Sequence, residues 1–241
     1  MEKSKINEKL KDFVVIGIGR LGENVARHLF ALGNEVLAID KSQSKINRLV
    51  DKVTTAVAAD TTSYDVLFSL GVQNFDCAIV CIRDDLEGSL LTAQVCKDLG
   101  VKYIIALARS EEHGKILKSL GVNLVIYPED YVGDKLASLL SKPGVNELIE
   151  LTEEFKIFEM KLPISWENKA IEDINIRKKY KLTIVFVKRG EEVISPEPDT
   201  ILIEGDVLVV AGESSKINSV ANLINDPVDI KEQLERIFSE K

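Results

Sequence analysis

Three glycines near the start of the chain are spaced for a phosphate-binding turn. Residues 17–22 have the pattern GxGxxG, directly after the apolar run 13–16 and before an amphipathic stretch at 23–32. In such a turn the first glycine allows a sharp reversal, the second lets a diphosphate approach the backbone, and the third lets the following helix pack closely. The first amide groups of that helix attract the anion. The pattern predicts a nucleotide site that includes Gly17, Gly19, Arg20, Leu21 and Gly22.

Polar residues follow the next two apolar runs of the chain. Asp40 comes where a ribose-binding carboxylate is expected in a dinucleotide fold, and Lys41 after it could contact a ribose or phosphate or lie in solvent. Asp60 and Thr61 could border an adenine, or form an Asx-type turn that begins the next helix. With the glycine turn, Asp40 predicts an adenine nucleotide, and it suits ATP, ADP and NAD(H) equally.

Three further charged residues could reach the same ligand. The guanidinium of Arg20, inside the glycine turn, can bind a terminal phosphate through two hydrogen bonds, or it can lie in solvent. Arg109 ends the fifth apolar run and is expected near the crevice at the carboxyl ends of the strands. Glu129 follows the last run and could hold a cation beside a phosphate, or act as an acidic first-turn residue of a helix. The residues alone favour the second reading of Glu129.

The sequence has no recognisable set of catalytic residues. His28 is expected on the surface of a helix, and His113 in the first turn of another. There is no GxSxG or Walker pattern, and the cysteines form no CxxC pair. A nucleotide site without a placed acid or base indicates a sensor rather than an enzyme. An NAD-dependent oxidoreductase with a small C-terminal domain is the alternative hypothesis.

The elements that position these residues follow a regular order. Short apolar runs alternate with amphipathic stretches of helical spacing, which is typical of a parallel sheet covered on both faces. We therefore predict an α/β fold with a doubly wound, Rossmann-like N-terminal domain over residues 1–148. The expected strands are 13–17, 35–39, 54–59, 77–82, 103–107 and 123–126.

The pattern changes after the Pro-Gly pair at 143–144, which is expected to end a helix. Residues 145–151 are interpreted as a short amphipathic piece. Beyond it the order strand, helix, three strands, helix cannot continue a parallel winding, so residues 149–224 are predicted to form a smaller α+β domain. The helices are expected at 169–179 and 215–224, and a polar helical tail at 225–241.

Charge and composition narrow the function classes. The chain has 241 residues, 31 Lys and Arg against 39 Asp and Glu, and a net charge of −8, which argues against a nucleic-acid partner. No run approaches the roughly 20 apolar residues of a membrane-spanning helix, and the charged start lacks an apolar signal core. Three unpaired cysteines fit a reducing compartment. We expect a cytoplasmic protein.

The chain resembles the regulatory subunits of Trk/Ktr-type potassium uptake systems, which are built from RCK (regulator of conductance of K⁺) domains. The resemblance covers residues 12–224 and includes the glycine turn, Asp40, the turn at 59–61, the segment 127–129, and the segments 173–177 and 202–208. It implies a homodimer that assembles into an octameric ring beneath a membrane-embedded potassium-translocating subunit, at the inner face of the cell membrane.

The same resemblance implies roles for individual residues. The N-terminal lobe would bind ATP or ADP, sometimes NAD(H), and the bound nucleotide would change the shape of the ring. Arg20 would contact the terminal phosphates. Glu129 would help to bind a divalent or monovalent cation beside them.

The C-terminal lobe of many family members binds cyclic di-AMP at the dimer interface. Thr183 stands where some relatives carry an amide, which puts this ligand in doubt, and a plain hydrophobic dimer seam is the alternative. The matching positions are Asn175, Ile176, Arg177, Ile184, Pro196 and Pro198.

Overall fold

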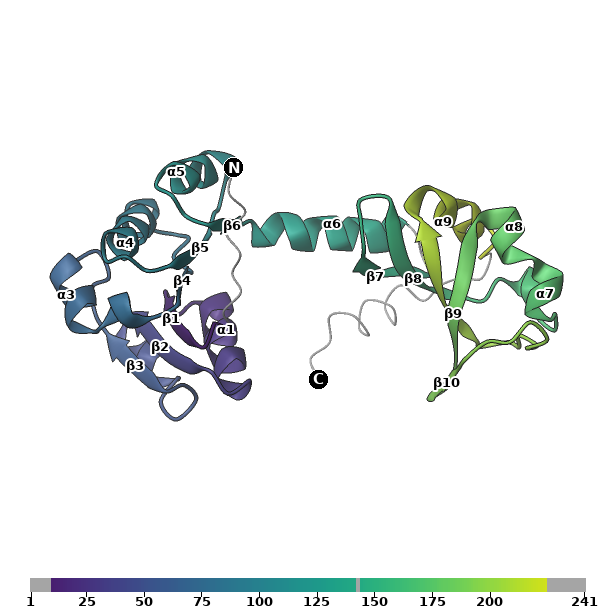
Figure 1. Ribbon diagram of the computed structural model, residues 1–241, viewed down its shortest axis with the longest axis horizontal. Coiled ribbons are helices and arrows are strands. Elements are labelled where there is room, and N and C mark those ends of the chain that lie inside the picture. Colours follow the sequence, from purple (N-terminus) through teal and green to yellow (C-terminus); the bar gives the residue numbers. More distant parts are fainter. Residues whose placement is uncertain (1–9, 142–143, 225–241) are drawn as a thin grey trace. The chain divides into compact units, whose positions relative to one another are not determined.

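A computed structural model describes residues 10–141 and 144–224 (Figure 1). It divides the chain into two compact units, with the division between Tyr131 and Val132. The sequence placed the boundary at 148/149. The difference arises because strand β7 (Val145–Glu150), which was interpreted as an amphipathic piece, pairs with a strand of the second unit. The tail expected at 225–241 lies outside the described residues.

The first unit contains a six-stranded parallel sheet with the order β3-β2-β1-β4-β5-β6. Every neighbouring pair in this sheet is parallel. The chain winds outward from β1 in one direction and then in the other, so the doubly wound fold predicted from the sequence is confirmed. The strands are β1 (Asp12–Ile16), β2 (Glu35–Asp40), β3 (Thr55–Ala58), β4 (Cys77–Val80), β5 (Tyr103–Leu107) and β6 (Leu124–Ile126).

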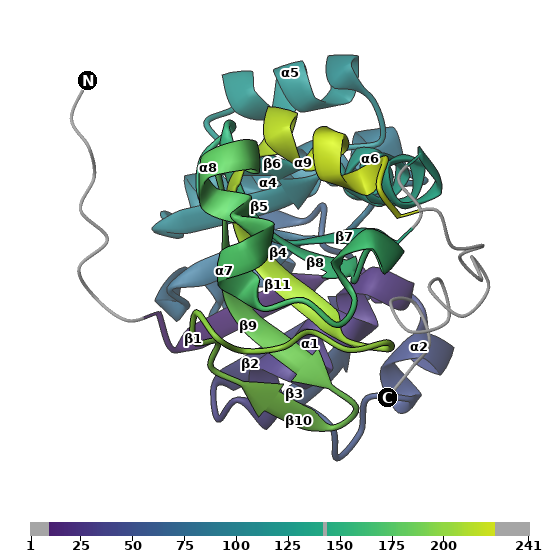
Figure 2. The same cartoon turned by 90° about the vertical axis from the view of Figure 1, so that its right-hand side faces the viewer.

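Helices cover both faces of this sheet because successive strand side chains point to opposite sides. Val14 and Ile16 of β1 belong to one core cluster, and Val15 between them belongs to another. The first cluster includes side chains of α3 (Tyr64–Ser69), α4 (Leu86–Asp98) and α5 (Glu111–Ser119). The second includes α1 (Arg20–Ala31) and α2 (Gln43–Asn47). The first unit therefore has the three layers of an α/β domain (Figure 2).

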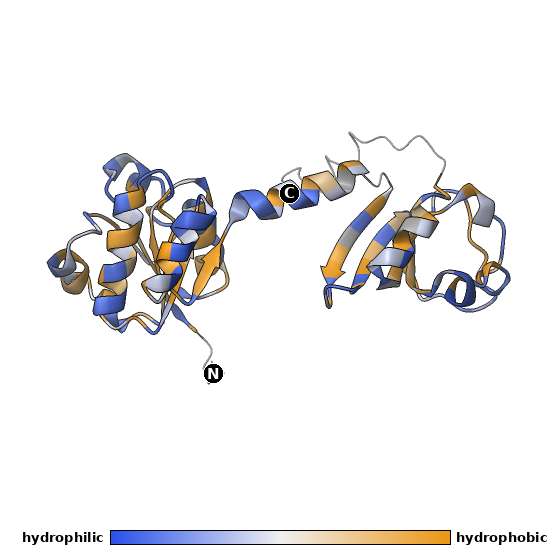
Figure 3. Cartoon of the chain, turned by 90° about the horizontal axis from the view of Figure 1, so that it is seen from above, coloured by the Kyte–Doolittle hydropathy of each residue, from blue (hydrophilic) through white to orange (hydrophobic). Residues whose placement is uncertain are grey.

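The second unit contains a five-stranded antiparallel sheet with the order β10-β9-β11-β8-β7. Figure 3 shows the alternation of apolar and polar residues along its strands. The buried residues form a separate core that contains Trp166, the single tryptophan of the chain. Besides β7, the strands are β8 (Phe155–Lys161), β9 (Leu182–Arg189), β10 (Glu192–Ile194) and β11 (Val207–Glu213).

The helices of the second unit depart from the sequence prediction in one place. The single helix expected at 169–179 is two short helices, because Asn175 adopts a left-handed conformation with φ of 53° and interrupts the helical hydrogen bonding. The second expected helix is present. The remaining helical segment of the first unit is η1 (Val72–Asn74), and α6 (Pro128–Ser141) begins in the first unit and ends in the second. The helical segments of the second unit are η2 (Ile164–Trp166), α7 (Ile171–Ile174), α8 (Ile176–Tyr180) and α9 (Ser214–Ala221). No helix of the described segments is long and apolar enough to cross a membrane.

An ion pair with a buried carboxylate joins the last residue of β9 to the residue before β11 in the second unit. The carboxylate of Asp206 is fully buried and accepts two hydrogen bonds of 2.8 Å from the guanidinium of Arg189. The amide of Ile203 donates to the same carboxylate at 3.0 Å. Burial alone would raise the pKa of Asp206, but these donors outweigh it and hold that pKa below its usual value.

We predict that Asp206→Asn lowers the free energy of unfolding of this unit by about 2–3 kcal/mol at neutral pH, because a charge-assisted pair is lost. The folded pKa lies below the unfolded one, so the wild-type advantage is fully present above about pH 4 and is lost as the pH falls through the folded pKa. Denaturant unfolding followed by Trp166 fluorescence between pH 3 and 7 measures this. The exposed Asp199→Asn is the control. A difference that stays constant down to pH 3 would contradict the assignment.

Candidate functional site

A cleft lies at the carboxyl edge of the parallel sheet in the first unit. The order of strands reverses between β1 and β4, and the loops that follow these two strands diverge there. This is where nucleotide sites form in doubly wound sheets. The cavity has a volume of about 580 Å³, which is sufficient for a nucleotide. It is lined by Gly17, Gly19, Asp40, Lys41, Lys45, Asp60, Thr61, Thr62, Cys81, Ile82, Arg83, Asp84, Asp85 and Gly88.

The glycine turn leaves its backbone open to a ligand. Gly17 has a φ of +92°, and a Cβ there would lie 2.9 Å from the backbone of Cys81. A Cβ at Gly22 would overlap the carbonyl oxygen of Gly17, so only glycine allows α1 to start this close to the turn. Gly19, by contrast, has open space where its Cβ would be, and no side chain caps α1 at this residue. The start of α1 therefore has no side-chain cap, and the space beside Gly19 is open, as binding of an anion there requires.

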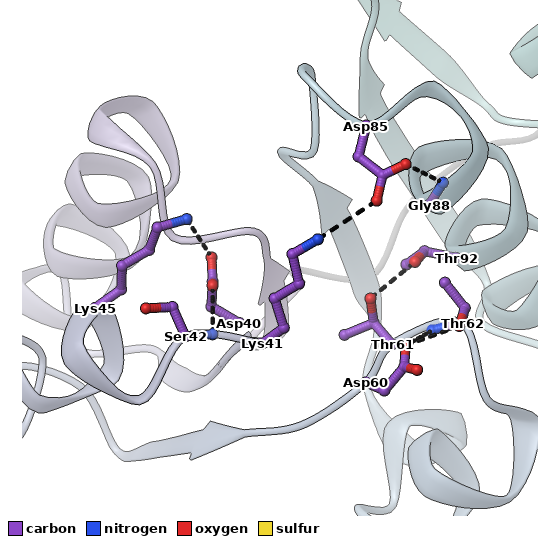
Figure 4. A network of polar contacts seen from close by, with 10 residues as sticks. All are labelled: Asp40, Lys41, Ser42, Lys45, Asp60, Thr61, Thr62, Asp85, Gly88 and Thr92. Atoms are coloured by element: carbon purple, nitrogen blue, oxygen red, sulfur yellow. Dashed lines mark hydrogen bonds and ion pairs between the residues drawn. The ribbon is translucent and has the colours of Figure 1, made fainter.

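Asp40 holds the glycine turn in place. Its carboxylate is 5% exposed and accepts hydrogen bonds from the amide of Ile18 at 2.7 Å and the amide of Ser42 at 2.8 Å. The ammonium group of Lys45 donates to it at 3.0 Å (Figure 4). Burial opposes ionisation, but the three donors outweigh it and keep the pKa of Asp40 below its ordinary value. Asp40 is therefore a carboxylate at neutral pH, as a ribose-binding role requires.

Two more pairs join the loops around the cleft (Figure 4). Lys41, after β2, lies 3.6 Å from the carboxylate of Asp85, which caps α4 after β4. Thr61, after β3, is within 2.8 Å of the hydroxyl of Thr92 on α4. The side chain and amide of Thr62 both donate to Asp60 and lower its pKa. The loops after β2, β3 and β4 are thus connected to one another.

Arg83 forms an ion pair with Glu129. Arg83 lies in the loop after β4 and lines the cleft, whereas Glu129 is in the first turn of α6 and does not line it. Both side chains are partly exposed, 40% for Arg83 and 62% for Glu129. Glu129 is thereby brought to the edge of the nucleotide cleft through Arg83.

The structure brings together only part of the predicted site. Arg20, Leu21 and Arg109 are exposed and lie outside the lining of the cleft, and Gly22 is buried beneath the turn. The amide of Arg109 instead approaches the ring of the buried His113 at 3.4 Å. The predicted residues that line the cleft are Gly17, Gly19, Asp40, Lys41, Asp60 and Thr61.

Several residues that line the cleft were not predicted from the sequence. Arg83, Asp84 and Asp85 directly follow an apolar run, as Asp40 and Asp60 do, so the same rule could have identified them. Lys45 had a weaker signal, because its contact with Asp40 depends on the turn between β2 and α2. Four aspartates and three cationic side chains line the cleft.

The cysteines are packing residues in this unit. Burial raises the pKa values of Cys77, Cys81 and Cys96 to about 12, so none is a thiolate at neutral pH. Within residues 10–141 and 144–224, no group of three or more His, Cys, Asp or Glu side chains could hold a metal ion.

The second candidate ligand site is divided between the core and the surface. Ile176 and Ile184 are 4% and 8% exposed and pack in the core of the second unit. Asn175, Arg177 and Pro198 are exposed, and the carbonyl of Pro198 accepts a hydrogen bond from Glu172 beside them. A ligand on this surface would meet the three exposed residues rather than the two isoleucines.

Comparison with protein families identifies both halves of the chain. A TrkA-N domain matches residues 13–128, and a TrkA-C domain matches residues 157–225. Residues 129–156, which contain most of α6 and β7, fall between the two matches.

Similar proteins of known sequence extend over nearly the whole chain. The Ktr system potassium uptake protein A of Bacillus subtilis (strain 168) is 37% identical over 89% of this chain and 97% of its own length. The Ktr system potassium uptake protein C of the same organism is 34% identical over 86% of this chain and 95% of its own length. The Ktr system potassium uptake protein A of Vibrio alginolyticus is 27% identical over 86% of this chain and 94% of its own length.

Solved structures with the same fold include the RCK domain of GsuK, with a TM-score of 0.62 and 19% identity over 92% of this chain. The GsuK channel bound to NAD has a TM-score of 0.59 and 19% identity over 92% of this chain. The chain spans 49% of the first of these and 41% of the second. The Ktr relatives and the TrkA-N and TrkA-C domains, which follow one another in this order, show that the chain belongs to the Trk and Ktr family of potassium uptake proteins, as its sequence motifs had indicated.

Proposed function

We propose that this chain is a nucleotide-sensing regulatory subunit of a potassium uptake system. Binding of ATP or ADP in the cleft between β1 and β4 would change the conformation of a ring of subunits and thereby gate ion flow. The observation that carries the proposal is the cleft itself: an open glycine turn and an ionised Asp40 at the switch point of the sheet, in a chain of this family.

The ribose and the diphosphate have separate places in this cleft. A carboxylate has about four acceptor positions, and three donors already occupy Asp40. The remaining position can accept a hydrogen bond from a ribose hydroxyl. The open space at Gly19 and the uncapped start of α1 would take the diphosphate.

Gating requires that the nucleotide bind one conformation of the ring more tightly than another. Arg20 is suited to this role because it is the first residue of α1 and is exposed outside the cleft lining. From there it would contact the terminal phosphate, in its own site or in that of a neighbouring subunit. A contact that depends on ring geometry would distinguish ATP from ADP.

The partner in this proposal is a membrane-embedded potassium-translocating subunit, as the names of the Ktr relatives suggest. The chain would form homodimers that assemble into an octameric ring in the cytoplasm, at the inner face of the membrane. Glu129 would contribute to a cation site beside the phosphates. Cyclic di-AMP is a candidate ligand for the exposed surface around Asn175, Arg177 and Pro198.

An NAD-dependent oxidoreductase is the second candidate function. The GsuK channel, which shares the fold, was solved bound to NAD, and Asp40 suits the unphosphorylated ribose of NAD. A dehydrogenase also needs an acid or base beside the reacting carbon. The cleft is lined by aspartates, two lysines and an arginine, and Asp40 and Lys45 are already paired with each other. We favour the regulatory function because the pairing of Asp40 with Lys45 already engages both groups and leaves neither placed as the acid or base of a dehydrogenase.

We predict that ATP or ADP stabilises the purified protein against thermal unfolding, by about 2.7 kcal/mol at a concentration of about 100 times Kd. A thermal-shift panel of ATP, ADP, NAD, NADH and cyclic di-AMP, each with and without Mg²⁺, measures the preference. Gly19→Val, which would fill the open space, should abolish the nucleotide shift without preventing folding. Consumption of NADH with a small carbonyl compound would favour the oxidoreductase, and no shift with any nucleotide would contradict both.

We also predict that Arg20→Ala weakens ATP binding by roughly tenfold and ADP binding much less, because a charge-assisted contact to the terminal phosphate is lost. Isothermal titration calorimetry with both nucleotides measures this. Arg27→Ala, an exposed arginine farther along α1, is the matched control and should leave both affinities unchanged. Equal losses for ATP and ADP would remove Arg20 as the residue that distinguishes them.

A further inference from the structure

The cationic side chains of the cleft are all engaged by the protein's own carboxylates. Among the described residues that line it, Lys41 pairs with Asp85, Lys45 with Asp40, and Arg83 with Glu129. A nucleotide brings several negative charges into a lining that already contains four aspartates. A phosphate would be bound more tightly if at least one of these cations exchanged its internal carboxylate for it.

The three pairs differ in how easily they exchange. Lys45 is bound to a carboxylate that is 5% exposed and that also holds the amide of Ile18, so removing it would leave a buried charge beside the turn. Lys41 and Asp85 are 3.6 Å apart, and the lysine side chain is 80% exposed, so this pair contributes little. Exchange is therefore costly for Lys45, whereas for Lys41 it is easy but changes the affinity little, because almost nothing is lost with the internal pair.

The pair of Arg83 and Glu129 has the properties that exchange requires. Glu129 is 62% exposed, so its carboxylate can return to water with a small desolvation change. The contact with Glu129 uses Nη1 of Arg83, one part of a guanidinium with five N–H donors. A guanidinium can bind a phosphate through two parallel hydrogen bonds, which a lysine cannot do.

We propose that Arg83 is an anion-binding residue of the cleft, and that Glu129 holds its guanidinium when the cleft is empty. The phosphates of the nucleotide and the carboxylate of Glu129 then compete for the same group. Glu129 lowers the affinity for nucleotide when no cation is present, and binding of phosphate to Arg83 releases Glu129. This inference rests on the proposed binding of an adenine nucleotide.

A mutant cycle tests the competition. ADP and adenosine are titrated calorimetrically, in EDTA to exclude divalent cations, into the wild type, Arg83→Ala, Glu129→Gln and the double variant. Arg83→Ala should weaken ADP binding roughly tenfold. Glu129→Gln should strengthen it by about threefold or more, since the competing charge is removed, and the double variant should resemble Arg83→Ala. The affinity for adenosine, which has no phosphate, should not change.

Matched variants separate the competition from a general effect of losing an ion pair. Lys115 and Glu111 form an exposed pair on α5, outside the cleft lining, and Lys115→Ala and Glu111→Gln should leave ADP affinity unchanged. If Arg83→Ala does not fold, Arg83→Lys takes its place. It should bind ADP with intermediate affinity, because it keeps the charge and loses the two-bond geometry.

The outcomes distinguish this inference from the function on which it rests. If the wild type binds ADP and Arg83→Ala binds it equally well, Arg83 is not an anion-binding residue and the inference alone fails. If Glu129→Gln weakens ADP binding in EDTA, or if both variants change adenosine binding as much as ADP binding, the pair only supports the loop after β4. If the wild type binds neither ligand, the proposed function fails as well.

Discussion

The nucleotide cleft depends on one buried hydrogen bond, from the amide of Ile18 to the carboxylate of Asp40. Ile18 follows β1, Asp40 is the last residue of the adjacent parallel strand β2, and the bond fixes the glycine turn against the end of β2. Keeping Asp40 ionised at 5% exposure is costly, and the amide of Ser42 and the ammonium of Lys45 offset that cost. The turn is thereby held with the start of α1 uncapped. The phosphate site proposed here would thus be prepared before the ligand arrives.

The charges around the cleft are balanced within the protein. Each cationic side chain in the lining has a carboxylate partner, and these partners come from different loops or, for Glu129, from α6. Such a site gives no strong attraction to anions in general, and it favours a ligand that replaces several internal contacts at once. The proposed exchange of partners would also connect the cleft to the segment that carries Glu129. A regulatory protein needs such a connection, because a ligand that changes no contact outside its own site cannot shift a conformational equilibrium.

The second unit is built on different constraints. Its sheet is entirely antiparallel, and one buried pair, Arg189 with Asp206, fixes β9 against the start of β11. The sequence pattern indicated this order of elements, except at two points. Strand β7 was missed because its signal is pairing with β8 rather than its own alternation, and Leu148 and Ile149 remain exposed within it. The break at Asn175 was missed because a left-handed residue inside a polar helical stretch has only a weak sequence signature.

The sequence by itself determined the doubly wound fold, the glycine turn and the position of Asp40. These features depend on local patterns: the alternation of strands and helices, and residues at fixed distances from a strand end. Only the tertiary structure decided which charged groups meet. Arg83 and Glu129 are 46 residues apart, and Lys41 and Asp85 follow different strands, so no local pattern connects them. Arg20, inside the glycine turn, and Arg109, after β5, lie outside the lining, because the position of a side chain in a loop depends on the course of that loop and not on its distance from a strand end alone.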